Sequence, residues 1–360
     1  MNDYSNTAVL GTGDRFAIGQ PVPRSEDPVL LRGEGHYSDD FNLPGQAYAV
    51  IVRSPLAHGV VRRIGTAAAR AMPGVLAVYT AADLEKGGIG PLPARQVMNN
   101  RDGTPMLQPV RHVLATDKVR YVGEAIAAVI AETAAQAKDA AEAAELDIEA
   151  LPAVTEPSAA TAPGAPRLYD DVLENVGLDF HFGDSAAVAE AFARAAHVTK
   201  LELRSNRIVV NPIEPRAALA EYDPARRHFT LHVGCQGVFG FRNYIAGVLG
   251  VSRDEVRIIT DRVGGSFGMK QPNMSEYFCL LHAARELRRP VKWTDERSGS
   301  FVSDTHGREA QMTAELALDK EGNFLAVRLT GTAMSALPMA PPARRRATRC
   351  GIRSACTRRR

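Results

Sequence analysis

The glycine-rich segment at residues 256–270 (VRIITDRVGGSFGMK) is the part of the sequence best suited to bind a ligand. An apolar run leads into a loop in which Gly264, Gly265 and Gly268 surround Phe267. Glycines permit unusual backbone angles and allow main-chain N–H groups to approach an anion or an oxo ligand closely. A plain turn with Phe267 in the core is the alternative. The spacing from Gly268 to Lys270 excludes a phosphate-binding P-loop.

Gln236 is the second candidate, within Gly234-Cys235-Gln236-Gly237. We expect a strand to end and a helix to begin here, so that the Gln236 amide could donate or accept a hydrogen bond above a sheet edge. A surface glutamine that caps the helix is the alternative. The neighbouring Cys235 thiol could be a nucleophile, but no histidine lies near it in sequence, and a buried, inert cysteine is favoured.

Other reactive side chains give weaker signals. NPIEPR at residues 211–216 places Glu214 and Arg216 on a rigid turn, as a functional acid or a structural ion pair. His228 and His232 share a face of a predicted strand, where packed or exposed histidines are favoured over a metal site. The four cysteines form no CxxC pair, which argues against a disulfide framework, a cysteine-rich zinc site and an iron–sulfur cluster built by this chain alone.

The elements around these residues alternate between strands and helices, which predicts an α/β (α+β) fold. After an N-terminus at residues 1–20 that we expect to be disordered, a first domain covers residues 21–150. It has strands at 47–52, 75–79, 119–122, 125–130 and 145–149 and helices at 66–72, 81–85 and 134–144. Thr133 is expected to cap the last of these helices. Residues 151–167 contain four prolines and are interpreted as a linker. A second region covers residues 168–330. It has helices at 185–195, 238–249 and 274–287, strands at 198–203, 217–222, 229–233 and 256–260, and a final hairpin that turns at Gly322.

The charge is unevenly distributed. The chain has 43 Lys and Arg against 41 Asp and Glu, but residues 344–360 alone hold eight arginines and no acid. The body is therefore mildly acidic, which excludes a chain-wide nucleic-acid surface. No apolar run is long enough to cross a membrane, and residues 1–20 lack the features of a secretory signal, so a cytoplasmic protein is expected.

The tail at residues 331–360 departs abruptly from strand patterning. Its proline, alanine and arginine content is typical of GC-rich DNA read out of frame, and we expect a frameshift near residues 331–333. A basic arm that binds nucleic acid or an acidic partner is the competing interpretation.

Several blocks, in order, resemble the large subunit of the xanthine dehydrogenase/aldehyde oxidase family, which includes carbon monoxide dehydrogenase-like enzymes. They include RGEGHYSDDFNLPG, VRYVGEAIAAVIAET, NPIEPRAALAEYD, GCQGVFGFRNYIAGVLGV and VGGSFGMK. The resemblance implies an α/β hammerhead domain followed by the first part of a molybdenum cofactor-binding domain. It also implies that Gln236, Gly264, Gly265, Phe267 and Gly268 contact a molybdenum–molybdopterin cofactor, either as such or in its dinucleotide form.

The activity implied by this resemblance is oxidative hydroxylation of a small molecule, an aldehyde or an N-heterocycle, or a carbon monoxide-type oxidation. Iron–sulfur and FAD groups would then lie on partner subunits, a small and a medium one, with no role for membrane or nucleic acid. The family's catalytic glutamate is not identifiable: Glu214, Glu276 and Glu296 do not stand in its motif. The alternative is a truncated, inactive fragment that acts at most as a scaffold or binding module.

Overall fold

The computed structural model describes residues 23–94, 98–334 and 344–350, and of the last segment only the backbone. The chain divides into two compact units, residues 1–36 and 37–360. In the first unit the described residues form the short helix α1 (Asp27–Leu31). The disorder expected for residues 1–20 lies outside the described residues.

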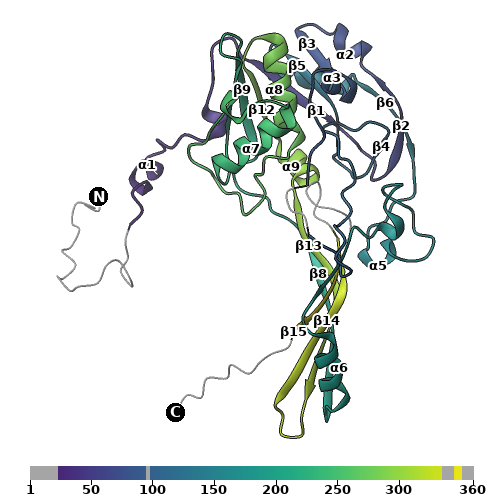
Figure 1. Cartoon of the computed structure of the whole chain (residues 1–360). Coiled ribbons are helices and arrows are strands. Elements are labelled where there is room, and N and C mark those ends of the chain that lie inside the picture. The colour runs from purple at the N-terminus through teal and green to yellow at the C-terminus, as the bar shows by residue number, and fades with distance from the viewer. Residues whose placement is uncertain (1–22, 95–97, 335–343, 351–360) are drawn as a thin grey trace, which may run out of the picture. The chain divides into compact units, whose positions relative to one another are not determined.

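A seven-stranded mixed sheet forms the centre of the second unit, in the order β11-β10-β9-β12-β1-β5-β3 (Figure 1). Its strands are β1 (Ala47–Arg53), β3 (Val75–Tyr79), β5 (Ala125–Ala131), β9 (Ala217–Asp223), β10 (His228–Val233), β11 (Val256–Ile259) and β12 (Val291–Thr294). Parallel pairing of β1 with β12 joins strands from before residue 150 to strands from after residue 168. The two regions expected as separate domains therefore share one sheet.

Helices cover both faces of this sheet. On one face the main hydrophobic core contains residues of α7 (Val238–Leu249) and α8 (Ser275–Leu287) together with alternate residues of β1, namely Ala47, Ala49 and Ile51. On the other face a smaller core includes residues of α2 (Ala67–Ala71) and α4 (Ala134–Glu142). All seven residues of β5 (AIAAVIA) are buried, because a strand covered on both faces has no polar side.

Two further sheets complete the unit. The first joins β4 (Lys118–Val119), β2 (Gly59–Gly65) and β6 (Glu145–Ala150). The second has the order β7-β15-β14-β13-β8 and consists of β7 (Leu178–Phe182), β8 (His197–Val209), β13 (His306–Leu318), β14 (Phe324–Ala333) and β15 (Arg344–Cys350). The helix α6 (Ser185–Ala193) shares a small core with β13 and β14. The remaining helices are α3 (Ala81–Lys86), α5 (Pro157–Ala160) and α9 (Arg297–Ser303), with 3-10 turns at Ser38–Asp40, Leu173–Asn175 and Arg253–Glu255.

Several local predictions are confirmed. Thr133 caps α4 by accepting a hydrogen bond from the Gln136 N–H at 3.2 Å. The hairpin of β13 and β14 turns at Gly322, which has a φ of +82°. The helix predicted at 238–249 coincides with α7. The sequence analysis did not predict four elements, β2, β7, β12 and α9. Of these, β12 and α9 are short, and neither shows a periodic apolar pattern long enough to identify it.

The structure corrects one expectation about the tail. Residues 344–350 were expected to lack strand character, but β15 pairs antiparallel with β14 and parallel with β7. Backbone pairing of this kind needs only an extended segment with free N–H and C=O groups, so a strand can form without an apolar pattern.

The segment at residues 151–167, interpreted from its prolines as a linker, is partly packed. It contains α5, in which Pro157 and Ala160 are buried. The side-chain amide of Asn175 donates to the carbonyl oxygens of Ala160 and Pro166, both at 2.9 Å. These hydrogen bonds attach the segment to the residues that follow it.

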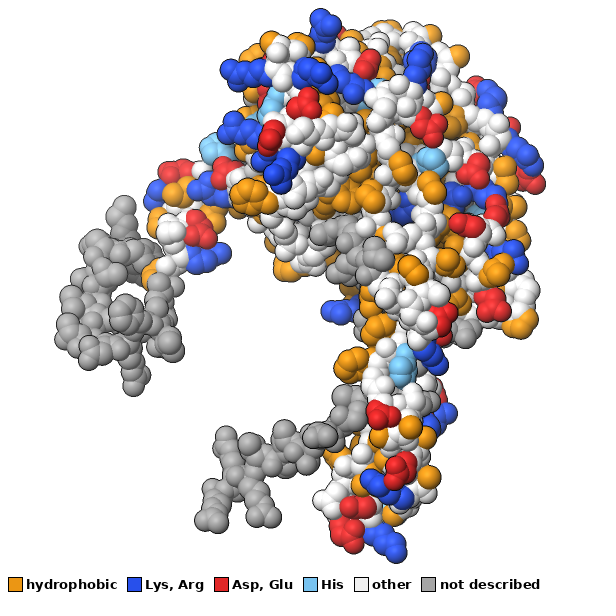
Figure 2. All heavy atoms as spheres, viewed as in Figure 1, with side chains coloured by type: hydrophobic (Ala, Val, Ile, Leu, Met, Phe, Trp, Pro, Cys, Tyr) orange, Lys and Arg blue, Asp and Glu red, His pale blue; other side chains and the backbone are white. Residues whose placement is uncertain are grey.

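The described surface carries charges of both signs. Figure 2 shows Lys and Arg interspersed with Asp and Glu on the visible face. Among the described residues, no helix combines the length and the apolar character needed to cross a bilayer.

A buried ion cluster lies where several elements of the seven-stranded sheet end. The guanidinium of Arg216, fully buried just before β9, contacts Asp304 at 2.6 Å, Glu276 at 2.8 Å and Asp295 at 3.4 Å. Arg53, at the end of β1, contacts the other Glu276 oxygen at 2.7 Å. The Trp293 ring also lies 5.0 Å from the Arg216 guanidinium. The cluster therefore connects β1, β9, β12, α8 and α9.

The Glu276 carboxylate has a pH-dependent role in stability. Burial alone would raise its pKa, but Arg216 and Arg53 outweigh burial and lower the pKa to about 2. A carboxyl whose folded pKa lies below its unfolded value stabilises the fold above the unfolded pKa, and this stabilisation is lost as the pH falls toward 2. Burial raises the pKa of Asp295 and of Asp304 instead, and their contribution has the opposite sign.

We therefore predict that Glu276→Gln removes part of the acid sensitivity. The variant should be less stable at pH 6 by about 3–5 kcal/mol, because it breaks a buried ion pair. Between pH 5 and pH 3 it should lose less additional stability than the unmodified chain. Urea unfolding at each pH measures both effects. Glu321→Gln, on an exposed turn, is the control, and its stability should depend on pH as that of the unmodified chain does. If E276Q and the unmodified chain lost equal stability between pH 5 and pH 3, Glu276 would not have the pH-dependent role assigned to it.

Candidate functional site

Three segments that are far apart in the sequence meet at one edge of the seven-stranded sheet. β10 and β11 are parallel neighbours, so their carboxyl ends lie at the same edge. Residues 234–239 follow β10, and the loop at residues 264–268 follows β11. The turn at residues 211–216 lies against this loop, where the Glu214 N–H donates to the Gly264 carbonyl at 3.2 Å. Carboxyl ends of adjacent parallel strands are a common place for ligand sites in α/β proteins.

Gln236 is bonded directly to the glycine loop. Its side-chain oxygen accepts from the Ser266 hydroxyl at 2.8 Å and from the Gly268 N–H at 3.0 Å. A backbone N–H can only donate, so the atom facing Gly268 must be the amide oxygen. The Gln236 NH₂ group is thus the end left to donate to a ligand, and the side chain is exposed. The two sequence candidates, Gln236 and the loop, form one site.

The loop backbone has the conformation that its glycines allow. Gly265 and Gly268 have φ values of +104° and +89°, and Phe267, although not a glycine, has +48°. Such a value for an aromatic residue is strained and is typical of functional loops. Among the described residues, the N–H groups of residues 265–267 have no hydrogen-bond partner. They form a cradle suited to an anion or an oxo group.

Phe267 is not a core residue. Its side chain is 78% exposed, which excludes the alternative of a plain turn with a buried ring. Two other large apolar side chains on the meeting segments are also exposed, Ile213 at 94% and Phe239 at 77%. We call Ile213, Phe239 and Phe267 the apolar rim. Exposed apolar groups beside unpartnered N–H donors are typical of a ligand site.

Glu214 fixes the start of the loop, a role that the sequence reasoning missed. One carboxylate oxygen accepts from the Gly264 N–H at 2.7 Å and from the Lys270 ammonium at 2.5 Å, and the other accepts from the Ser38 N–H at 3.2 Å. Lys270 is only 2% exposed, and its burial lowers the pKa of its ammonium although Glu214 opposes that shift. Glu214 and Arg216, considered as a possible pair, instead bind different partners. No local pattern in the sequence points to the Glu214–Lys270 pair, because the two residues are 56 positions apart.

The other reactive side chains have structural surroundings. Cys235 is buried, and its burial raises the pKa of its thiol, as expected for an inert cysteine. His232 lies 3.0 Å from Glu221 and stacks on Phe41. Glu296 pairs with Lys138 at 2.8 Å on the surface. Within the described residues, no group of three or more His, Cys, Asp or Glu side chains could hold a metal ion.

We predict that Gly264→Ala disrupts the loop. A Cβ on Gly264 would lie 2.6 Å from the Glu214 Cβ, so the loop or the turn must move. Overpacking of this kind costs roughly 1–3 kcal/mol, and amide hydrogen exchange at residues 262–270 should accelerate. Gly247→Ala is the matched control: it lies inside α7 with no atom within 4 Å of its Cβ position, and alanine there should stabilise the helix. Unchanged exchange in G264A would contradict the proposed packing.

Comparisons with known proteins agree with this architecture. The family model described as "Aldehyde oxidase and xanthine dehydrogenase, a/b hammerhead domain" matches residues 32–152, and that described as "Molybdopterin cofactor-binding domain" matches residues 168–341. The nicotine 6-hydroxylase large subunit of Paenarthrobacter nicotinovorans is 35% identical over 316 residues, which cover 87% of this chain and 38% of the relative. The carbon monoxide dehydrogenase large chain of Hydrogenophaga pseudoflava is 32% identical, over 87% of this chain and 40% of its own.

Solved structures show the same likeness. Carbon monoxide dehydrogenase from Oligotropha carboxidovorans superposes with a TM-score of 0.78 at 32% identity, over 86% of this chain and 39% of that one. Quinoline 2-oxidoreductase from Pseudomonas putida 86 has a TM-score of 0.78 at 28% identity, over 92% and 44%. The chain spans about two-fifths of the length of the relatives it matches. With a hammerhead region and a molybdopterin cofactor-binding region joined through one sheet, the chain belongs to the xanthine dehydrogenase/aldehyde oxidase family.

Proposed function

We propose that this chain forms part of the large subunit of a molybdenum hydroxylase, with the molybdopterin cofactor held at Gln236 and the loop of residues 264–268. The observation that carries the proposal is the bonding of Gln236 to this loop, which leaves its NH₂ group and three backbone N–H groups of the loop without partners among the described residues. The donors present fit the group: a pterin cofactor with oxo ligands offers oxygen acceptors, and each of these four groups is a hydrogen-bond donor. When bound, the cofactor supplies the two-electron oxidation that hydroxylates an electron-poor carbon.

The residues of this chain bind the cofactor and orient the substrate beside it. The Gln236 amide and the N–H groups of residues 265–267 donate to cofactor oxygens, and the apolar rim excludes water from the carbon to be oxidised. Exposed rings at Phe239 and Phe267 suit a flat or extended organic substrate, an N-heterocycle or an aldehyde, better than carbon monoxide. The similarity to a nicotine 6-hydroxylase large subunit supports the same class.

Partner subunits complete the electron path in this proposal. Among the described residues Cys235 and Cys279 are free and buried, and neither belongs to a cluster that could hold iron. Iron–sulfur and FAD groups would therefore be on a small and a medium subunit. One relative, 35% identical, is named as subunit gamma of a 6-hydroxypseudooxynicotine dehydrogenase complex.

A second candidate is a chain that binds cofactor without catalysis, as a scaffold or binding module. The hydrogen bonds of Glu214, the carboxylate bonded to the loop, favour this candidate. Both of its oxygens are already occupied, by the Gly264 N–H, Lys270 and the Ser38 N–H, so Glu214 is not free to act as a general base. Catalysis, by contrast, would need a glutamate from outside the described residues.

The two candidates are separated by cofactor content and turnover. We predict that the 360-residue chain, produced with cofactor assembly intact, retains pterin and molybdenum by fluorescence and elemental analysis. Gln236→Ala should lower retained pterin by about tenfold, a loss typical of one or two hydrogen bonds to a ligand. Gln108→Ala, on an exposed loop, is the control and should retain the normal amount. Equal retention in Q236A would contradict the site, and retention without oxidation of any aldehyde or N-heterocycle would favour the scaffold.

A further inference from the structure

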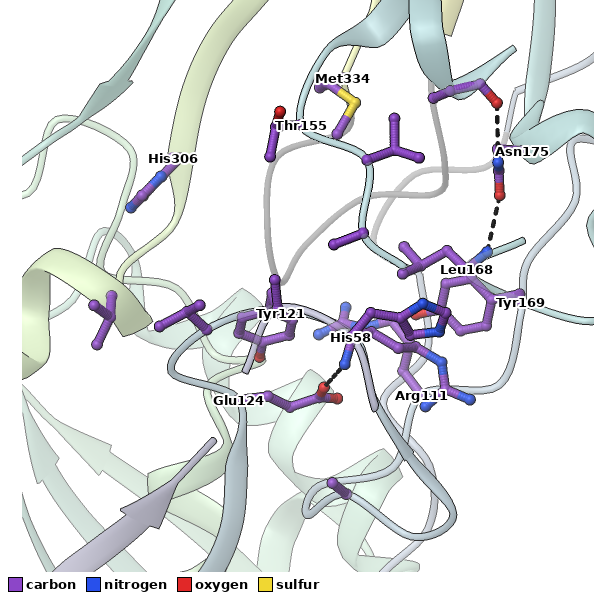
Figure 3. A pocket seen from close by; sticks show the side chains of 18 of the residues that line it. His58, Arg111, Tyr121, Glu124, Thr155, Leu168, Tyr169, Asn175, His306 and Met334 are labelled. Carbon is purple, nitrogen blue, oxygen red and sulfur yellow. Dashed lines mark hydrogen bonds between the residues drawn. The ribbon is translucent and has the colours of Figure 1, made fainter. Parts of the chain in front are cut away.

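A cavity of about 390 Å³ has a lining that includes neither Gln236 nor any residue of the glycine loop. Figure 3 shows part of this lining, with His58, Arg111 and Glu124 among the labelled side chains. Its walls come from residues 110–124, from residues 152–155 and 166–169, and from the end of α9. Most of the wall is apolar: Ala57, Val110, Val113, Leu114, Ala115, Val122, Pro152, Ala153, Val154, Leu168, Phe301 and Val302. The volume lies in the range of small-molecule sites.

His58 presents an unsatisfied acceptor at this cavity. Its Nδ1 lies 3.0 Å from the Pro152 carbonyl oxygen, which can only accept, so the proton is on Nδ1. In the neutral ring the other nitrogen, Nε2, then carries a lone pair and can accept a hydrogen bond. It is buried without a hydrogen-bond partner among the described residues, on a side chain that is 6% exposed. Buried polar atoms are almost always paired, so an unpaired one at a cavity wall indicates a missing ligand group.

Arg111 presents an unpaired cation at the same cavity. The other two lining arginines are engaged: Arg120 donates to the Lys118 carbonyl at 3.0 Å and stacks on Tyr169, and Arg207 pairs with Glu309 at 3.2 Å. Within the part of the chain that the structure describes, the Arg111 guanidinium makes no hydrogen bond and no direct ion pair, although its charge lies close enough to Glu124 to lower the pKa of that carboxyl. A guanidinium facing an apolar cavity is best matched by a carboxylate, which it binds with two parallel hydrogen bonds.

Two acidic groups also line this cavity. One Asp304 oxygen is bonded to the buried Arg216, and the other is buried without a partner among the described residues. Glu124 accepts from the Arg120 N–H, and burial raises the pKa of its carboxyl to about 7 although Arg120 and Arg111 oppose that shift, so it is about half ionised near neutral pH. Tyr121 and Tyr169 add two aromatic rings to the wall. The cavity thus combines a cation, an acceptor and aromatic surface.

We propose that this cavity binds a small organic carboxylate with an aromatic body, its carboxylate on Arg111 and a hydroxyl or ring N–H donated to His58 Nε2. The ligand would be a molecule of aromatic-acid size, which the cavity volume accommodates. This site does not depend on the cofactor, so it can be tested in a preparation with or without molybdenum.

Titration calorimetry on the 360-residue chain tests the proposal, with benzoate as the probe and benzyl alcohol as its uncharged counterpart. Benzoate should bind one site at least about tenfold more tightly than benzyl alcohol, and Arg111→Met should remove that advantage while leaving benzyl alcohol binding unchanged. Arg226→Met, at an exposed turn, is the matched control and should change neither affinity. No benzoate binding, or equal benzoate affinity in R111M and the unmodified chain, would overturn the proposal.

A second variant covers the case in which R111M does not fold, as judged by circular dichroism. At least one of the three hydroxybenzoates should bind more tightly than benzoate to the unmodified chain, because its hydroxyl can donate to His58 Nε2. His58→Phe should abolish that difference and keep the affinity for benzoate. If no hydroxybenzoate gains over benzoate, or if the gain persists in H58F, the assignment of His58 is wrong.

Discussion

The buried guanidinium of Arg216 is the constraint on which the rest of the second unit depends. A charge removed from water is tolerated only when it is fully paired, and Arg216 obtains its pairing from three carboxylates on three different elements. Glu276 in turn is shared with Arg53 of β1. The cluster forms only when β1, β9, β12, α8 and α9 are all in place, so it couples the hammerhead region to the cofactor-binding region.

The ion cluster also positions the glycine loop, because the turn at residues 211–216 connects the two. Arg216 ends the turn at residues 211–216, and Glu214 in the same turn holds the Gly264 N–H and the Lys270 ammonium. Pro212 contacts the loop where Gly265 lacks a Cβ, 3.0 Å from the position such an atom would take. A rigid turn anchored by a buried ion cluster can hold a strained loop in one conformation. Flexibility is therefore not needed to explain the positive φ of Phe267.

Polar groups in this chain fall into two kinds by their partners. Those of the ion cluster and of the Glu214–Lys270 pair bond to one another, apart from Asp304 Oδ2, which is buried without a partner among the described residues. Another set has no hydrogen-bond partner within the described residues: the Gln236 NH₂ group, the N–H groups of residues 265–267, His58 Nε2 and the Arg111 guanidinium. Because unpaired polar groups at a cavity or loop have a free-energy cost that a ligand can remove, the second kind marks the places where the molecule can bind something.

The sequence by itself determined the elements with strong local signals. The apolar run of β5, the Thr133 cap, the α7 and α8 helices and the Gly322 turn follow from periodicity and turn chemistry, which act over a few residues. The glycines around Phe267 and the ordered blocks of family resemblance also identified the loop and Gln236 as candidates. Only the tertiary structure decided that Gln236 is bonded to the glycine loop, that Phe267 is exposed, and that the regions on either side of residues 151–167 share one sheet.

These features depend on contacts between distant parts of the chain. Parallel pairing of β1 with β12 joins residues more than 240 positions apart. The ion cluster likewise collects charges spread from Arg53 to Asp304. A charged residue in sequence looks the same whether it is solvated or buried; what distinguishes the two is the set of partners that folding brings to it.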